Sequence, residues 1–197
     1  MLNLNHLLLL ATVATLPFST TAAPTTTTTN PTPNLTHPSP VTTHTVIAGR
    51  GGGGLRFDPD NIVAAAGSVI EFHFLPANHS VVEAAFDAPC VPKNDTSFDS
   101  GFFPVAASAD GAAVQSGEVF QFVVGDEERP VWFYCAQGRH CMGGMVGVVN
   151  QGFGGAEGGK TLGRFRDAAK GFVGVSASQG AVQGGWRGEN PNPLAGF

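Results

Sequence analysis

The chain has 197 residues, a formal net charge of −5 and only 13% charged side chains. This length allows one domain of ordinary size plus extensions, and the lack of a basic excess argues against a nucleic-acid partner. Glycine occurs 27 times, and its abundance, with many prolines and threonines, indicates that part of the chain lies outside a packed core.

Residues 1–23 have the outline of a secretory signal peptide. An apolar run from Leu7 to Phe18 is followed by small residues, which predicts cleavage near Ala22 or Ala23. The alternative is a short membrane anchor, because no Lys or Arg precedes the run. The run is too short to cross a bilayer comfortably. We therefore expect a secreted protein, extracellular or in a cell wall, without stable membrane insertion.

Residues 24–44 form a linker rich in proline and threonine, typical of an extended, O-glycosylated and disordered segment. Its two histidines, His37 and His44, are expected to be solvated. The linker also contains an N-glycosylation sequon at Asn34.

Residues 45–150 have the pattern of an all-β domain. Apolar and polar residues alternate in "SVIEFHF" and "EVFQFVV", the short stretches "PVWFYC" and "MVGVVN" close the region, and Gly, Pro and Asp turns separate these stretches. About a hundred residues of short strands predict a β-sandwich or barrel. The domain has 12 acidic and 5 basic side chains, a net charge of −7.

A long irregular stretch between Phe86 and Gly117 interrupts this pattern, and Cys90 could pin it. It carries a second sequon at Asn94, which we expect to be glycosylated. Residues 151–197 hold 13 of the 27 glycines and are expected to form a flexible tail with a short helix, because "TLGRFRDAAKGFV" spaces its apolar residues helically.

The stretch "FYCAQGRHCMGGM", residues 133–145, gathers two cysteines, one histidine and two methionines. Cys135 ends one expected strand and Met145 begins the next, with His140 between them. A thiolate, an imidazole and a weak thioether suit copper, and a blue-copper site requires a second histidine. His79, just beyond the strand that ends near Leu75, is the candidate, and its neighbours Asn78 and Ser80 could bond to the loop of Cys135.

The three cysteines cannot all pair within one secreted chain. The unpaired thiol would be a metal ligand, an intermolecular bridge or a reactive site. If Cys135 binds metal, Cys90 and Cys141 remain to form a disulfide that ties the long loop to the loop of His140.

The stretches "FDPDNIVAAAGSVIEFHF", "NHSVVEAAFDAPC", "FDSGF" and "WFYCAQGRHCMGGMVGVVN" resemble cupredoxins. More narrowly, they look like the secreted fungal cupredoxin-like proteins called extracellular serine-rich proteins, with ligand spacing similar to plant phytocyanins. The resemblance covers about half the chain. It implies a Greek-key β-sandwich with one type 1 copper ion and electron transfer, and it assigns the ligand roles to His79, Cys135, His140 and Met145. The C-terminal tail departs from the usual Ser-rich extension of the family.

Other interpretations of single residues compete with these assignments. His73 is expected to be an ordinary strand histidine on the face of Glu71. Met142 could replace Met145 as axial ligand, but it follows Cys141, whose side chain is assigned to the disulfide. A glycan on the sequon at Asn78 would disrupt a buried site, so Asn78 is not expected to carry one.

Two hypotheses follow for the function. The first is a secreted mononuclear copper protein, a monomer that passes single electrons to an unknown redox partner. The second is an extracellular or cell-wall module that holds copper without redox turnover. Zinc could also bind Cys and His but makes little use of thioethers, and a Cys–His protease lacks an oxyanion-hole signature. We expect no enzymatic activity.

Overall fold

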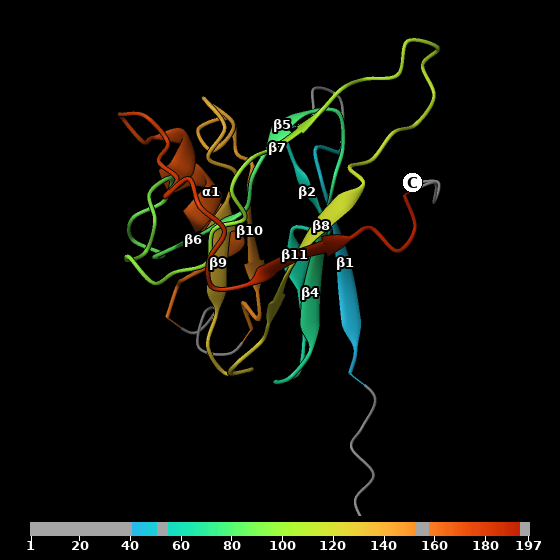
Figure 1. The fold of residues 1–197 in the computed structure, drawn as a ribbon. Helices are drawn as coiled ribbons and strands as arrows, with labels where there is room; N and C mark the ends of the chain where they lie inside the picture. The colour runs from blue at the N-terminus through green and yellow to red at the C-terminus, as the bar shows by residue number, and fades with distance from the viewer. Residues whose placement is uncertain (1–40, 51–54, 153–157, 194–197) are drawn as a thin grey trace, which may run out of the picture. The chain divides into compact units, whose positions relative to one another are not determined.

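Two β-sheets face each other and enclose the main hydrophobic core (Figure 1). The computed structural model describes residues 41–50, 55–152 and 158–193, and these belong to one compact unit. Its elements in chain order are β1 (Thr43–Ala48), β2 (Phe57–Asp58), β3 (Asn61–Ile62), β4 (Val69–Phe74), β5 (Ala77–His79), β6 (Val82–Ala84), β7 (Phe103–Val105), β8 (Glu118–Val123), β9 (Val131–Tyr134), β10 (Val146–Val149), α1 (Leu162–Lys170) and β11 (Trp186–Glu189). The expected all-β sandwich is confirmed.

The first sheet has five strands in the order β11-β8-β4-β1-β2, and the second has four in the order β3-β10-β9-β6. A separate two-stranded ribbon of β5 and β7 lies at one end of the sandwich (Figure 1). The chain passes back and forth between the two sheets, so that β4 continues into β5 and β6 while β8 continues into β9. This alternation brings strands far apart in sequence to the same end of the molecule.

Strand β1 runs parallel to β4, from the pair Thr43–Val69 at one end to the pair Ala48–Phe74 at the other. Both strands therefore point toward the β5–β7 ribbon. β1 begins within the predicted linker, and His44 is half-buried in it rather than solvated, because it pairs with Ile70 in the sheet. The predicted signal peptide, His37 and the sequon at Asn34 lie outside the described residues.

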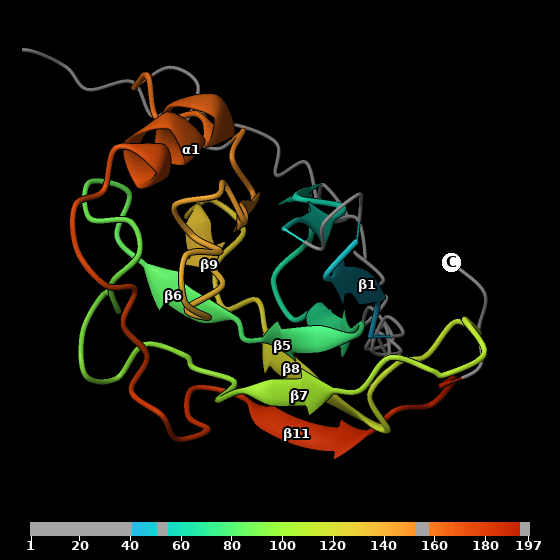
Figure 2. The same cartoon turned by 90° about the horizontal axis from the view of Figure 1, so that it is seen from above.

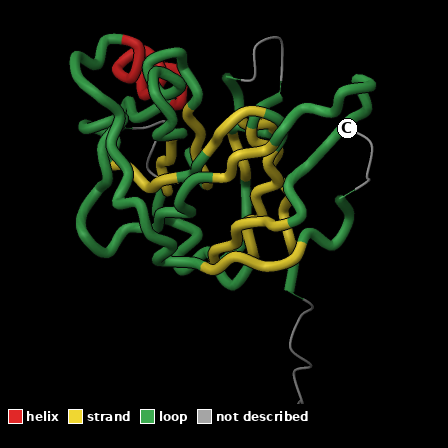
Figure 3. The backbone as a smooth tube through the Cα atoms, turned by 45° about the horizontal axis from the view of Figure 1, so that its top comes forward, coloured by secondary structure: helices red, strands yellow, loops and turns green. Residues whose placement is uncertain are grey.

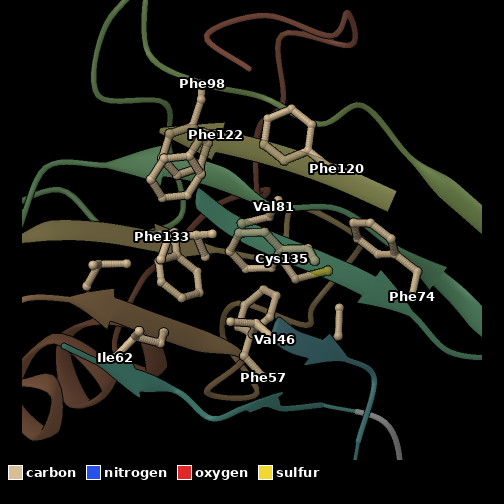
Figure 4. Packing of buried hydrophobic residues seen from close by; sticks show 14 of the residues in the cluster. Val46, Phe57, Ile62, Phe74, Val81, Phe98, Phe120, Phe122, Phe133 and Cys135 are labelled. Carbon is tan, nitrogen blue, oxygen red and sulfur yellow. The ribbon is translucent and has the colours of Figure 1, made fainter. Parts of the chain in front are cut away.

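Alternation along the strands divides the buried side chains between two clusters. The inner cluster, between the sheets, contains Val46, Ala48, Phe57, Ile62, Ala64, Ile70, Phe72, Phe74, Val81, Phe98, Phe103, Phe120, Phe122, Val124, Phe133, Cys135, Met145 and Val149. Figure 4 shows how closely its phenyl rings pack around the side chain of Cys135. The residues of "SVIEFHF" and "EVFQFVV" that we expected to share an apolar face do so.

The outer cluster lies between α1 and the outer face of the second sheet (Figure 2). It contains Val82, Ala84, Cys90, Trp132, Tyr134, Ala136, Cys141, Val146, Val148, Leu162, Phe165 and Ala169. The residues of β9 thus alternate, with Phe133 directed to the inner cluster and Trp132 and Tyr134 to the outer one. Such alternation is the period-two signature of a strand that is buried on both faces.

Helix α1 lies where the sequence predicted a short helix. Thr161 caps its N-terminus by accepting a hydrogen bond from the Arg164 amide at 3.3 Å. Leu162, Phe165 and Ala169 fall on one face at helical spacing and are buried. The ring centre of Phe165 lies 5.0 Å from that of Trp132, and its full burial contributes about 2 kcal/mol to stability.

The C-terminal segment differs from the flexible tail that its glycine content suggested. Between residues 158 and 193 it contains α1 and then β11, which pairs antiparallel with β8 at the edge of the first sheet. Figure 3 shows α1, the helix drawn in red, beside the yellow strands. Gly185 lies so close to Phe120 and to the carbonyl of Gln121 that any side chain there would clash, which explains the use of glycine in a packed segment.

Candidate metal centre

Cys135 follows the last residue of β9 and places its thiol in the inner cluster (Figure 4), close to His79 on β5. Its side chain faces inward because it continues the alternation that directs Phe133 inward. The residue is fully buried, and it is the free cysteine of the described chain.

Two histidines direct the same ring nitrogen toward this thiol. The Nδ1 atom of His140 lies 3.4 Å from Cys135 Sγ, and the Nδ1 atom of His79 lies 3.9 Å from it. All three potential donor atoms lie within 4.8 Å of one another. The structure therefore brings together three of the four predicted ligands from two separate parts of the chain, β5 and the loop after β9.

The residues from Cys135 to Met145 form a short loop, here called the ligand loop, which its own backbone holds in shape. The amide of Met145 donates to the carbonyl of His140 at 3.0 Å, and the amide of Cys135 donates to the carbonyl of Met145 at 3.1 Å. These bonds fix the relative positions of the three residues before any metal binds.

The two methionines of the ligand loop point to different clusters. Met145 is fully buried in the inner cluster that also contains Cys135. Met142 instead packs against the outer cluster, where its sulfur lies 3.9 Å from the hydroxyl of Ser176. This placement favours Met145 over Met142 as the candidate axial ligand.

Ser80 and Asn78 connect β5 to the ligand loop, as the sequence suggested. The Ser80 amide donates to Cys135 Sγ at 3.4 Å, and the Ser80 hydroxyl accepts from the Ala136 amide at 2.8 Å. The Asn78 side-chain amide donates to Gln137 Oε1 at 2.8 Å. Bonds of this kind orient ligands, and they occupy the nitrogen of Asn78 that a glycan would need.

The environment of Cys135 opposes ionisation in the absence of metal. Burial raises the pKa of the thiol, and the hydrogen bonds from the backbones of Ser80 and Gln137 only partly offset this effect. At neutral pH the metal-free protein therefore holds a neutral thiol. A metal ion that binds sulfur would displace this proton.

Both histidines are held in the neutral form, which is the form that binds metals. Burial, and then the proximity of His140, lowers the pKa of His79 to about 4, while the backbone of Pro76 acts in the opposite direction. Burial also lowers the pKa of His140. A proton on either ring would compete directly with a metal ion.

The backbone of Gly49 packs directly against the ring of His79, a contact that the sequence analysis did not identify. A Cβ atom at this position would lie 2.6 Å from His79 Nε2, and the backbone has a φ of +106°, which favours glycine. No residue of the described chain makes a well-aligned hydrogen bond to this nitrogen. The buried ring is thus fixed by close packing, and no signal in the sequence marks Gly49 for this role.

A disulfide joins Cys90 to Cys141, with a Cα–Cα distance of 5.6 Å. It ties the long segment before β7 to the residue that follows His140, as expected if Cys135 is reserved for metal. Closing a loop of 51 residues in this way typically adds about 2–4 kcal/mol of stability. Both half-cystines are fully buried in the outer cluster.

Other residues singled out in the sequence lie away from this group. His73 is buried on the outer side of the first sheet, where its ring contacts Glu71 Oε1 at 2.7 Å and Gln115 Oε1 at 2.8 Å. Asn94 is exposed, and its side-chain oxygen accepts bonds from Thr96. These positions agree with a structural role for His73 and leave Asn94 accessible.

The four candidate ligands differ in their exposure to solvent. His79, Cys135 and Met145 are fully buried, whereas His140 is partly exposed. Its neighbours Gly138 and Arg139 are exposed. The imidazole of His140 is therefore the part of the donor group nearest to solvent.

The donor set fits a soft metal ion. One thiol and two Nδ1 atoms converge, the thioether of Met145 lies in the same cluster, and the group is buried in an apolar surround. Two imidazoles and a thiolate, with a weak thioether, are the ligands that a mononuclear copper site uses, whereas zinc makes little use of thioethers.

Comparison with known proteins identifies relatives of this chain. It is 35% identical over 136 residues to "Extracellular serine-rich protein" of Arthroderma benhamiae, covering 68% of this chain and 48% of that protein. It is 30% identical over 119 residues to "Probable GPI-anchored cupredoxin-1" of the same organism, covering 60% of this chain and 55% of that protein. The chain thus spans about half the length of these relatives. No protein-family model matches it.

Two solved structures are also similar. Reduced auracyanin from the photosynthetic bacterium Roseiflexus castenholzii has a TM-score of 0.36 and 17% identity, covering 55% of this chain and 94% of that one. Auracyanin B has a TM-score of 0.36 and 16% identity, covering 57% and 90%.

Among the described residues, no helix is long and apolar enough to cross a membrane. The names of the two relatives agree with the resemblance drawn from "NHSVVEAAFDAPC" and "WFYCAQGRHCMGGMVGVVN". The sandwich and the convergence of His79, Cys135 and His140 agree with it as well. The chain has a cupredoxin-like β-sandwich and is related to a fungal extracellular serine-rich protein and to a protein named as a probable GPI-anchored cupredoxin.

Proposed function

We propose that this protein is a secreted carrier of single electrons that uses one type 1 copper ion. The observation that supports this most directly is the convergence of His79 Nδ1, His140 Nδ1 and Cys135 Sγ within 4.8 Å at a buried position. His79, Cys135 and His140 would bind the ion, with Met145 as weak axial ligand. Copper would supply a centre that is stable in both the Cu(I) and Cu(II) states.

The protein's own contribution is a rigid, water-poor site. Backbone bonds within the ligand loop, the Cys90–Cys141 disulfide and the contacts of Ser80 hold the donors before a metal binds. A site that is already organised changes little between oxidation states, which favours fast electron exchange. The partly exposed His140 would be the point at which electrons enter and leave.

Secretion is supported by the names of the relatives, one called extracellular and the other GPI-anchored. The predicted signal peptide, the disulfide and the accessible sequon at Asn94 are consistent with this location. The partner is proposed to be a redox protein outside the cell or a cell-wall component, and the protein itself a monomer without enzymatic activity.

Copper(II) titration of the purified chain, followed by visible absorption, tests this proposal. We expect one equivalent to produce an intense thiolate-to-copper band, and the variant Cys135→Ser to lack it while circular dichroism shows that it remains folded. Tighter binding of zinc than of copper, or a band that survives in Cys135→Ser, would contradict the proposal.

Measurement of electron exchange distinguishes an electron carrier from a protein that only holds copper. A carrier should be reduced and reoxidised reversibly, with rapid exchange between the two oxidation states. A copper complex that forms the band but resists reversible reduction would support the alternative, an extracellular module that holds copper without redox turnover.

A further inference from the structure

Segment Asp99–Phe103 lies against the strand that carries His79. Phe103 pairs with His79 in the β5–β7 ribbon. Ser100 bonds twice to Val81, because its amide donates to the Val81 carbonyl at 3.0 Å and its hydroxyl accepts from the Val81 amide at 2.8 Å. Contacts with this segment therefore hold the chain at His79, the last residue of β5, and again two residues later at Val81.

The other side of the same segment is held by Arg187, on strand β11. The guanidinium donates to the carbonyl of Ser100 from Nε at 3.1 Å and from Nη2 at 2.8 Å, and to the carbonyl of Phe102 from Nη2 at 2.9 Å. Its central carbon lies 3.9 Å from the ring centre of Phe103. Figure 2 shows β7 between β5 and β11.

Asp99 provides a second attachment to the C-terminal segment. Its carboxylate is fully buried and accepts bonds from the Ser178 hydroxyl at 2.7 Å, the Gln179 amide at 2.7 Å and the Gly101 amide at 2.8 Å. A buried carboxylate is tolerated only with such partners. The segment is thus fastened to residues 178–187 at both of its ends.

We propose that Arg187 is a positioning residue for the metal centre, which it serves by fixing the segment that holds His79. This inference rests on the proposed function, since it concerns the same site. Arg187 contacts Ser100 and Phe103. Ser100 in turn bonds to Val81, and Phe103 pairs with His79. Ser80 lies between His79 and Val81 in the sequence, and its amide donates to Cys135 Sγ at 3.4 Å. The C-terminal segment is therefore part of the scaffold of the site.

The chemistry of arginine suits this role better than that of lysine. The planar guanidinium reaches two carbonyls and stacks on an aromatic ring at once, and a single ammonium group reproduces only part of this arrangement. The ion pair with Glu118, at 3.8 Å, adds little orientation. Arg187→Lys should therefore act as a partial variant, intermediate between the wild type and Arg187→Ala.

The first measurement is hydrogen exchange of the Val81 amide in the metal-free full-length chain. We expect exchange to be about tenfold faster in Arg187→Ala and less affected in Arg187→Lys. The control is Arg129→Ala, because the Arg129 side chain is 82% exposed and forms a surface ion pair with Asp126 at 3.5 Å. In this control the exchange rate of the Val81 amide should equal that of the wild type.

The second measurement is copper(II) affinity and the visible spectrum of the same variants. Loss of a residue that orients ligands typically weakens metal binding by about 10–100-fold, and we expect about tenfold for Arg187→Ala with an altered thiolate band. Arg129→Ala should match the wild type in both. A purely structural role would lower the thermal midpoint yet leave the affinity and spectrum of the folded variant unchanged.

The outcomes separate this inference from the proposed function. A wild-type chain that binds no copper overturns the proposed function, and with it the positioning role. If the wild type gives the expected band but Arg187→Ala matches it in band, affinity and Val81 exchange, only the inference is overturned. If Arg187→Ala does not fold, the variant Arg187→Lys decides. A wild-type thiolate band, copper affinity and Val81 amide exchange in this variant would overturn the inference. A partial loss of copper affinity with faster Val81 exchange would support it.

Discussion

At the scale of single residues, the site combines one thiol held neutral with two imidazoles held neutral. The proton of Cys135 is retained because burial raises its pKa, and the ring of His79 stays unprotonated because burial and His140 lower its pKa. A metal ion would therefore replace a proton at sulfur but none at the imidazoles. Binding should release protons, and the affinity should fall as pH falls.

The lowered pKa of His79 has a consequence for the stability of the metal-free protein. Its pKa is about 4 in the folded state against 6.5 for an ordinary histidine, so the unfolded state takes up a proton first as the pH falls. This contribution is fully present above pH 6.5 and is lost between pH 6.5 and 4. Urea unfolding should show a loss of up to about 3 kcal/mol over that window.

The matched variant is His79→Gln, which removes the titrating group and should flatten that part of the pH profile. If the free energy of unfolding falls equally steeply with pH in the wild type and in His79→Gln between pH 6.5 and 4, His79 does not titrate as described.

Met145 should tune the site rather than create it. In Met145→Leu we expect the thiolate band to persist, since Cys135 and both histidines remain, and the reduction potential to rise, because a donor that favours Cu(II) is lost. Cyclic voltammetry and absorption measure the two effects. The same substitution at Met142, which packs against the outer cluster, should change neither. Loss of copper from Met145→Leu would argue against this division of roles.

At the scale of elements, the ring of Phe133 on strand β9 covers Gly147 on the neighbouring strand β10 so closely that a glycine is required. A Cβ atom at Gly147 would lie 2.3 Å from Phe133 Cζ and 3.0 Å from the carbonyl oxygen of Asp60. Gly147→Ala should therefore destabilise the protein by about 1–3 kcal/mol through overpacking. Gly125→Ala is the control, because nothing lies within 4 Å of a Cβ atom there. Equal denaturant midpoints for Gly147→Ala and Gly125→Ala would contradict this expectation.

The strands of the core could be predicted because their periodicity is local. The alternation in "SVIEFHF" and "EVFQFVV" is visible within seven residues, and the assignment of side chains to the inner cluster follows it. The place of β11 could not be predicted in this way. Its four residues, Trp186–Glu189, show no apolar alternation, and they become a strand only because β8 offers an open edge to pair with.

The convergence of the candidate ligands was predictable for a different reason. Cys135, His140 and Met145 lie within eleven residues, and sulfur with imidazole at that density has few structural explanations. His79 depended on the resemblance as well as on its place after a strand. The roles of Gly49 and Arg187 depend on contacts with His79 and Ser100 that only the folded chain reveals.

At the scale of the whole molecule, charge is distributed unevenly along the chain. Residues 45–150 have a net charge of −7, whereas residues 151–197 carry five basic and three acidic side chains. Arg139 is the one charged residue of the ligand loop, since His140 is neutral. The acidic surface elsewhere would attract a cationic partner at long range, and this attraction should weaken with salt.

Electron exchange with small charged redox reagents tests this arrangement. At low salt, Arg139→Glu should speed exchange with a cationic reagent by roughly twofold to tenfold and slow exchange with an anionic one, and both effects should shrink as ionic strength rises. Arg129→Glu makes the same charge change before β9, at the end of that strand away from Cys135, and should have a smaller effect. Equal responses of the two variants would mean that His140 is not the entry point.

The direction of β1 has a consequence for how the molecule can be tethered. The strand starts beside Val69 and ends beside Phe74, and Gly49 then contacts His79, so the chain enters the sandwich at the end away from the ligands (Figure 1). Any anchor attached ahead of β1 is joined to the domain at that distal end. A protein immobilised there, on a wall polymer or on an electrode, would have its attachment point at the end opposite the face where electrons would be exchanged.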